Sequence, residues 1–85
     1  MTLNKLASKY ILKTERVLND IKISQGSKLI DAESVKEVID EAKRYLEDAK
    51  FYLDRERFET SLASVAYCEG LLDALQLLGL VDFSW

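Results

Sequence analysis

Apolar residues recur every three or four positions along three stretches of this 85-residue chain, and the chain contains no proline. That spacing gathers apolar side chains on one face of a helix, and the lack of proline leaves each helix uninterrupted. We predict helices at about residues 2–23, 31–53 and 57–78, followed by an apolar tail at residues 80–85. Each helix must bury its apolar face against another, so we expect an all-α single domain over residues 1–85. The predicted architecture is a three-helix bundle, in which a long N-terminal helix packs on an antiparallel helical hairpin.

Two starts are open for the second helix. With Asp31 as the N-cap, Ile30 and Val35 take the spacing of a hydrophobic staple. The alternative start is Ser34, which forms a capping box with Glu37. We favour Asp31 because a Ser34 start would put a charged residue at the staple position.

The break between the second and third helices has no glycine or proline, since it reads Asp54-Arg55-Glu56. One unbroken helix of more than forty residues is therefore the alternative to a hairpin. We reject it because a single rod could not fold back to bury both apolar faces. Gly79 fits the residue that ends the third helix, because glycine readily adopts the left-handed conformation found there.

Histidine is absent from the chain, and Cys68 is its single cysteine. These counts exclude imidazole bases, histidine zinc sites and an internal disulfide, and no glycine-rich phosphate loop is present. We assign no catalytic residue, no metal ligand and no cofactor, and we expect a binding protein rather than an enzyme. A lone cysteine fits a reducing compartment, so we expect a cytoplasmic protein.

The most apolar segment, Leu71–Val81, is too short to span a membrane and is interrupted by Asp73 and Gln76. The formal net charge of −3 argues against nucleic acid as the partner. A minor hypothesis is nonetheless RNA binding by the basic first helix, through residues such as Lys9 and Lys13.

The third helix has more apolar surface than two partner helices can cover. Its polar residues cluster only as Glu69, Asp73 and Gln76, and a strip of small residues would admit another backbone: Ala63, Ala66, Gly70 and Ala74. An exposed apolar patch of this kind usually marks a contact surface. We therefore expect a protein–protein interaction or accessory module that forms a homo-oligomer or binds another protein. The expected interface consists of large apolar residues, namely Leu71, Leu75, Leu78, Phe83 and Trp85.

An acidic group supports a different class of function. Glu69 and Asp73 lie four residues apart on one helix, and Asp40 with Glu41 lies on the helix before. Carboxylates that face each other across a helical bundle can hold magnesium or manganese. The alternative function is therefore a metal-dependent nucleotide-handling site built from acidic residues of the second and third helices.

Two motifs in the second half of the chain carry a resemblance. Residues 45–49 read Tyr-Leu-Glu-Asp-Ala, and residues 67–75 read Tyr-Cys-Glu-Gly-Leu-Leu-Asp-Ala-Leu. Together they resemble the archaeal domain-of-unknown-function family number 357. The resemblance covers about the last half of the chain well. It departs at the hairpin turn, where Glu56-Arg57 stands in place of the usual Gly-Asp before the aromatic residue.

The resemblance implies an archaeal cytosolic helical bundle with no assigned activity. Its signature positions correspond here to Tyr45, Asp48, Ala49, Tyr67, Glu69, Gly70 and Asp73. Ala49 and Gly70 are interpreted as packing positions. Packing does not require Asp48, Glu69 and Asp73, which are therefore the candidate functional polar residues.

Overall fold

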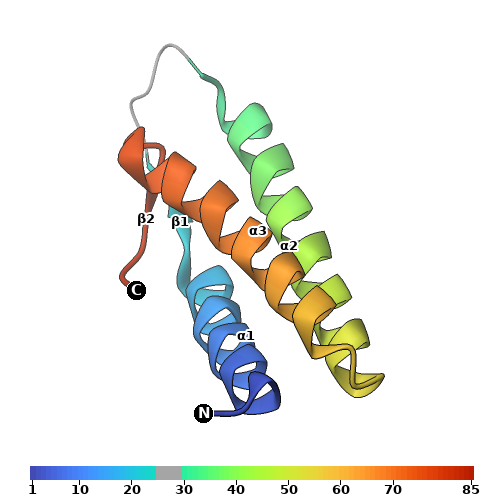
Figure 1. Ribbon diagram of the computed structural model, residues 1–85. Coiled ribbons are helices and arrows are strands. Elements are labelled where there is room, and N and C mark those ends of the chain that lie inside the picture. Colours follow the sequence, from blue (N-terminus) through green and yellow to red (C-terminus); the bar gives the residue numbers. More distant parts are fainter. Residues whose placement is uncertain (25–29) are drawn as a thin grey trace.

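The computed structural model describes residues 1–24 and 30–85, which form a three-helix bundle (Figure 1). Its helices are α1 (Leu3–Asp20), α2 (Ala32–Asp54) and α3 (Phe58–Leu77). Two short strands, β1 (Lys22–Ile23) and β2 (Val81–Asp82), follow α1 and α3. Helix α1 packs on the antiparallel α2–α3 hairpin, so the predicted all-α architecture is confirmed.

Side-chain caps fix the starts of α1 and α2. The Thr2 hydroxyl oxygen accepts a hydrogen bond from the Lys5 backbone N–H, at 3.2 Å. The Asp31 carboxylate accepts one from the Ser34 backbone N–H, at 2.7 Å. Both bonds satisfy amides that have no partner inside the helix. The Asp31 start of α2 is therefore confirmed, and the alternative start at Ser34 is wrong.

The break between α2 and α3 is a tight turn of three residues. The Arg57 N–H donates to the Tyr52 carbonyl at 2.9 Å, and the Glu56 N–H donates to the Leu53 carbonyl at 3.0 Å. These two bonds form a Schellman motif, which closes a helix and reverses the chain. Glu56 takes the left-handed conformation that the motif requires, with φ of 60°. The hairpin is confirmed, and the continuous-helix alternative is excluded.

The same motif ends α3 at Gly79, as predicted. Gly79 has φ of 72°, and the Leu80 N–H donates to the Leu75 carbonyl at 2.9 Å. The chain then turns back along the bundle, and β2 pairs antiparallel with β1, Lys22 opposite Asp82. This pairing explains why α1 ends at Asp20 instead of residue 23, because the next residues are extended. The two strands were not predicted, because a strand of two residues is too short to show an alternating pattern in the sequence.

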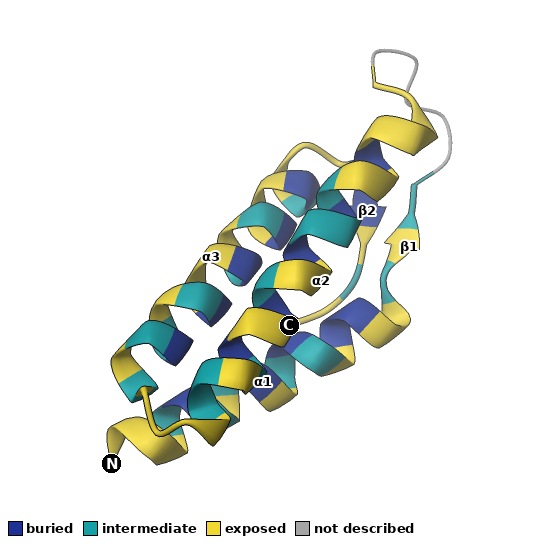
Figure 2. Cartoon of the chain, turned by 90° about the vertical axis from the view of Figure 1, so that its right-hand side faces the viewer, coloured by how far each residue is buried: buried dark blue, intermediate teal, exposed yellow. Residues whose placement is uncertain are grey.

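The core lies between the three helices and is closed at one end by the tail. Figure 2 shows the buried side of each helix facing the others. Small residues of the hairpin helices are fully buried, since Ala42, Ala49 and Cys68 have no exposed surface. The buried Ser61 hydroxyl donates to the Ala49 carbonyl at 2.7 Å, which ties α3 to α2. Leu80, just before β2, is also buried, so the tail is part of the core.

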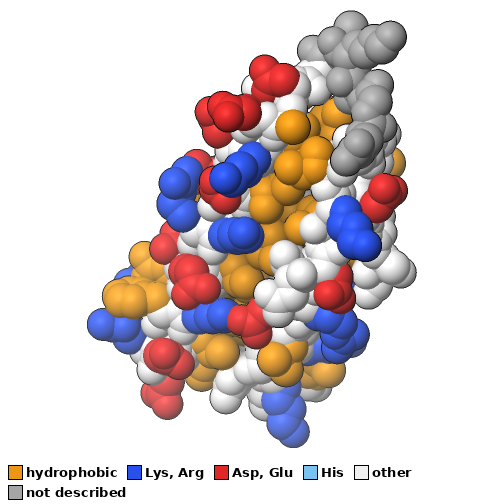
Figure 3. Space-filling view, turned by 180° about the vertical axis from the view of Figure 1, so that it is seen from behind, with side chains coloured by type: hydrophobic (Ala, Val, Ile, Leu, Met, Phe, Trp, Pro, Cys, Tyr) orange, Lys and Arg blue, Asp and Glu red, His pale blue; other side chains and the backbone are white. Residues whose placement is uncertain are grey.

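Charged side chains are concentrated on α1 and α2. From behind, they border a strip of hydrophobic side chains (Figure 3). Lys50 of α2 pairs with Glu15 of α1 and so bridges the two helices. Within the described ranges, no helix has the length and apolarity needed to cross a membrane.

Candidate interaction surface

The polar side of α3 lies toward α1 and the tail, although Asp73 on that side stays exposed. Glu69 is half-buried, and its carboxylate accepts a hydrogen bond of 3.3 Å from the fully buried Thr14 hydroxyl. The Lys13 ammonium lies 3.8 Å from the same oxygen atom. The Glu69 carboxylate therefore joins α3 to α1. Its partners Thr14 and Lys13 satisfy its hydrogen-bonding capacity at this half-buried position.

Asp73 and Gln76 fasten the tail to the same side of α3. The Trp85 indole N–H donates to the Asp73 carboxylate at 2.7 Å, and the Gln76 amide donates to the Phe83 carbonyl at 2.8 Å. The Lys13 ammonium lies 4.9 Å from the Trp85 ring centroid, a cation–π distance. Two of the three candidate functional polar residues, Glu69 and Asp73, thus have structural partners inside the chain.

The opposite side of α3 faces solvent and carries almost no charge. Helix α3 contains only three charged residues, Glu59, Glu69 and Asp73. We define the outward face of α3 as the residues opposite its buried side, all of them exposed: Glu59, Ala63, Ala66, Gly70, Ala74 and Leu77. A solvent-facing helix surface normally carries charged and polar side chains, so this face is unusual.

Large apolar side chains stand at the C-terminal end of this face. Leu77 is 87% exposed and Leu78 is 66% exposed. Beside the N-terminal half of the face, a groove of about 470 Å³ runs between α1 and α3. Its lining is mostly apolar and consists of Tyr10, Leu62, Ala63, Val65, Ala66 and Glu69. The groove continues the outward face through Ala63 and Ala66, which belong to both.

The predicted interface residues occupy three different environments. Leu75 is only 4% exposed and lies in the core, so the structure assigns it to the fold and not to a surface. Leu71 and Phe83 are half-buried against the core. Leu78 is exposed, and Trp85 is partly exposed. The sequence analysis assigned Leu75 to the interface because it is a large apolar residue of the third helix, and a helix taken alone does not show which of its residues the rest of the chain buries.

A pair of stacked tyrosines lies on the α2 side of α3. The Tyr45 and Tyr67 ring centroids are 4.4 Å apart, with an angle of 29° between the planes. Tyr67 is exposed, whereas burial raises the pKa of the Tyr45 hydroxyl, with further contributions from Tyr67, Glu41 and Asp48. The apolar periodicity of the two helices did not predict this stack. Both tyrosines are signature positions of the family resemblance, which was the one feature of the sequence that pointed to these two residues together.

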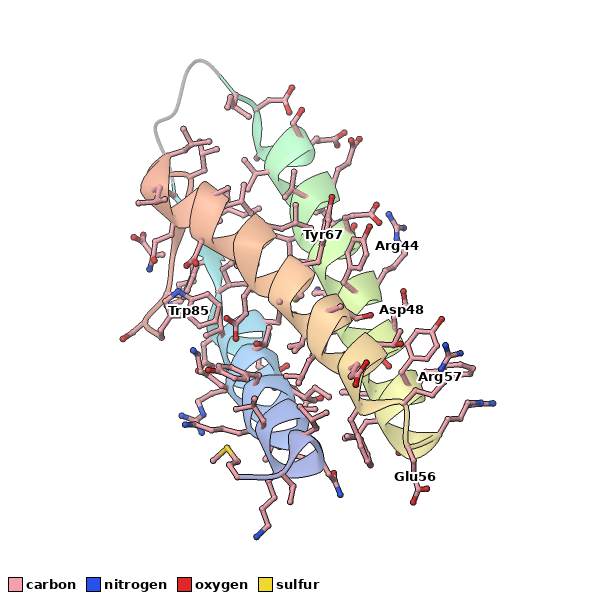
Figure 4. All side chains as sticks on the ribbon, in the orientation of Figure 1. Arg44, Asp48, Glu56, Arg57, Tyr67 and Trp85 are labelled. Atoms are coloured by element: carbon pink, nitrogen blue, oxygen red, sulfur yellow. The ribbon has the colours of Figure 1, made fainter. Side chains whose placement is uncertain are left out.

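Asp48 lies beside the tyrosine pair, and Figure 4 shows it with Arg44 and Tyr67 on the side of α3 away from Trp85. It lines a shallow depression of about 380 Å³ on α2. The side chain of Asp48 makes no hydrogen bond or ion pair with any other residue among 1–24 and 30–85. It is therefore the one candidate polar residue whose presence the fold leaves unexplained.

The acidic residues proposed for a metal do not gather in one place. Glu41 pairs with Arg44 on the surface of α2, while Glu69 and Asp73 face α1 and the tail. In the part of the chain that the structure describes, no three acidic or cysteine side chains are grouped closely enough to hold a metal ion. No observation here brings the acids of α2 and α3 together.

Comparison with known proteins gives one match. A family model described as "Protein of unknown function (DUF357)" matches residues 9–81. The match covers all three helices and both strands except the first residues of α1 and the last residue of β2. No curated protein and no solved structure matches the chain significantly.

Proposed function

Because this chain belongs to the DUF357 family, which has no assigned function, we propose a function from its surface: a protein–protein interaction module. Its binding surface is the outward face of α3, and its ligand is a helix of another protein molecule. We place this accessory module in the cytoplasm, where its single thiol stays reduced.

The observation that supports the proposal is the distribution of polar and apolar residues around α3: the polar side has partners within the chain, and the apolar side is exposed. Its polar residues Glu69, Asp73 and Gln76 are used inside the chain, where they hold α1 and the tail. Its uncharged side, from Ala63 to Leu77, is left in solvent. Covering an exposed helix face that is uncharged over most of its length is favourable, because its apolar surface then leaves water.

Small residues favour a helix as the ligand. Without bulky side chains, the backbone of α3 can be approached by a second helix at the short end of the range of about 8–10 Å between axes. Leu77 and Leu78 supply the large apolar contacts at one end of the face. A flat strip bordered by a groove suits an elongated ligand better than a compact small molecule.

The test is affinity capture from a lysate of the source organism with three forms of the protein. Gly70→Arg places a charge in the middle of the outward face, where a new Cβ meets no atom within 4 Å, so the fold should survive. Leu12→Arg is the matched control, because Leu12 is an exposed leucine on α1. We expect the wild type and Leu12→Arg to retain the same proteins and Gly70→Arg to lose them. Identical retention by all three forms would contradict the proposal.

A further inference from the structure

We propose that the stacked tyrosines Tyr45 and Tyr67, together with Asp48, form a binding site for an arginine side chain of another protein. The guanidinium group stacks on the Tyr67 ring, and the Asp48 carboxylate pairs with its charge. This inference goes beyond the proposed function, because the site lies on the α2 side of α3 and uses no residue of the outward face. Three observations support it: an exposed ring without a cation, a carboxylate without a partner, and the position of Tyr45 between them.

The Tyr67 ring is exposed in a chain that covers its other exposed aromatic rings with cations. Three aromatic residues are exposed: Phe51 at 48%, Tyr67 at 58% and Trp85 at 37%. The Arg55 guanidinium carbon lies 3.6 Å from the Phe51 ring centroid, and the Lys13 ammonium lies 4.9 Å from the Trp85 ring centroid. Within residues 1–24 and 30–85, no such cation lies over Tyr67. Because an aromatic face attracts cations, this ring can accept one from outside the chain.

The Asp48 carboxylate is the acidic half of the site. It is exposed and unpaired among the described residues, whereas the other acids of the same depression have partners. Glu41 pairs with Arg44. Glu47 lies 3.4 Å from the Lys50 ammonium. The lining of the depression contains three acids against two bases, so its charge is complementary to a cationic ligand.

Tyr45 holds the two halves of the site next to each other (Figure 4). Its ring stacks on Tyr67, with 4.4 Å between the centroids. Asp48 follows Tyr45 by three residues on α2, so their side chains are neighbours on one helix face. After burial and Tyr67, the charges of Glu41 and Asp48 also raise the pKa of the Tyr45 hydroxyl, which agrees with a negative potential at the stack.

Arginine fits this combination better than lysine or a metal ion. Its planar guanidinium can lie flat on an aromatic ring while its N–H groups donate to a carboxylate. The chain already uses the first of these contacts, between Arg55 and Phe51. A lysine ammonium is a compact and strongly hydrated charge, and one carboxylate supplies too few oxygen ligands for a divalent cation. The shallow depression is open, so a side chain that projects from another protein can reach it.

Titration of the ¹⁵N-labelled full-length protein with the capped peptide acetyl-Gly-Arg-Gly-amide tests the site by NMR. A single guanidinium contact is weak, so we expect half-saturation at roughly 1–10 mM. The backbone amide signals of Tyr45, Asp48 and Tyr67 should shift together. The same peptide with citrulline, which has nearly the same shape but no charge, should cause no shift.

Three variants assign the binding to named side chains. Asp48→Asn and Tyr67→Leu should each weaken the binding of the arginine peptide at least about threefold. Glu33→Gln is the matched control, because it removes the same charge from α2 at a position about 22 Å away along the helix. It should bind like the wild type. All three positions are exposed, so the spectra of the variants should retain the dispersion of a folded protein.

The contrary outcomes are distinct from those of the proposed function. Equal binding of the arginine and citrulline peptides, or of the wild type and Asp48→Asn, would overturn the proposal, since recognition would not depend on charge. A lysine peptide that binds as tightly as the arginine peptide would overturn arginine as the ligand. No shift up to about 50 mM arginine peptide would overturn the site itself. None of these results changes the capture experiment with Gly70→Arg, which decides the proposed function separately.

Discussion

Trp85, the last residue of the chain, donates its indole N–H to the carboxylate of Asp73 on α3, at 2.7 Å. The same indole ring lies 4.9 Å from the Lys13 ammonium of α1, and its neighbour Phe83 packs against it edge to face at 4.9 Å. The tail is thus joined to both α1 and α3. This attachment gives the polar side of α3 partners within the chain and leaves the outward face, from Ala63 to Leu77, in solvent.

We predict that Trp85→Phe lowers the free energy of unfolding by about 1 kcal/mol, because it removes one hydrogen bond to a charged acceptor at a partly exposed site. Urea unfolding followed by circular dichroism measures the change. Asp73→Asn is the control, since the amide oxygen can still accept the indole N–H, and it should lose less. An unchanged unfolding midpoint in Trp85→Phe would show that the bond does not hold the tail.

A second prediction concerns the hairpin turn, where Glu56 is held in the left-handed conformation with φ of 60°. Glu56→Gly should raise the free energy of unfolding by about 1 kcal/mol, because glycine adopts this conformation without steric cost. Thermal or urea unfolding of the purified variant measures the gain. Glu56→Ala keeps the Cβ atom and should leave stability within about 0.5 kcal/mol of the wild type. An equal gain in both variants would assign the effect to the lost charge.

The three helices could be predicted from the sequence because periodicity and caps are local signals. The Asp31 cap and Gly79 each follow from a residue type at a known position, and the structure places both as expected. The turn at Glu56 carried no such signal, since glutamate rarely occupies the left-handed region.

The surface was harder to predict, because exposure depends on which elements pack together. On a helical wheel, Glu69 and Asp73 read as a solvated polar side, and Leu75 reads as available for a partner. Contacts with α1 and the tail change that interpretation: both acids have partners inside the chain, although Asp73 stays exposed, and Leu75 is buried. The contact between Thr14 and Glu69 joins residues more than fifty positions apart. Contacts between residues so distant in the chain leave no pattern that can be recognised in a single sequence.

A third prediction concerns acid stability. The Ser34 backbone N–H, followed by the Ser34 side chain, holds the pKa of Asp31 below its usual 3.8. A carboxyl with a lowered pKa in the folded state adds stability above the unfolded pKa and loses it as the pH falls through the folded value. Asp31→Asn keeps a capping oxygen but cannot titrate. The urea midpoint should therefore fall more steeply in the wild type than in Asp31→Asn between about pH 5 and about pH 2. Parallel curves would show that the cap is not charge-dependent.

The last prediction uses the buried thiol of Cys68. Burial, and to a lesser degree the charge of Glu69, raises the pKa of Cys68 to about 12. The side chain has no exposed surface, and the thiolate is the form that reacts with disulfide reagents. In the native protein at pH 8, Cys68 should therefore react at a rate set by unfolding of the bundle. The measurement is the rate of reaction with a chromogenic disulfide as the urea concentration rises.

The matched control for that rate is Gly70→Cys, two residues further along α3 on the exposed side, where a new side chain has open space. Its added thiol should react fast without urea, while Cys68 in the same molecule reacts slowly, so one protein gives two separate phases. Because a thiol with a raised pKa stays protonated in the folded state while the unfolded thiol ionises, stability should also fall as the pH rises above about 9. A single fast phase for both thiols would mean that the α2–α3 contact opens without global unfolding, and the core around Cys68 would then be a local, separately unfolding part of the bundle.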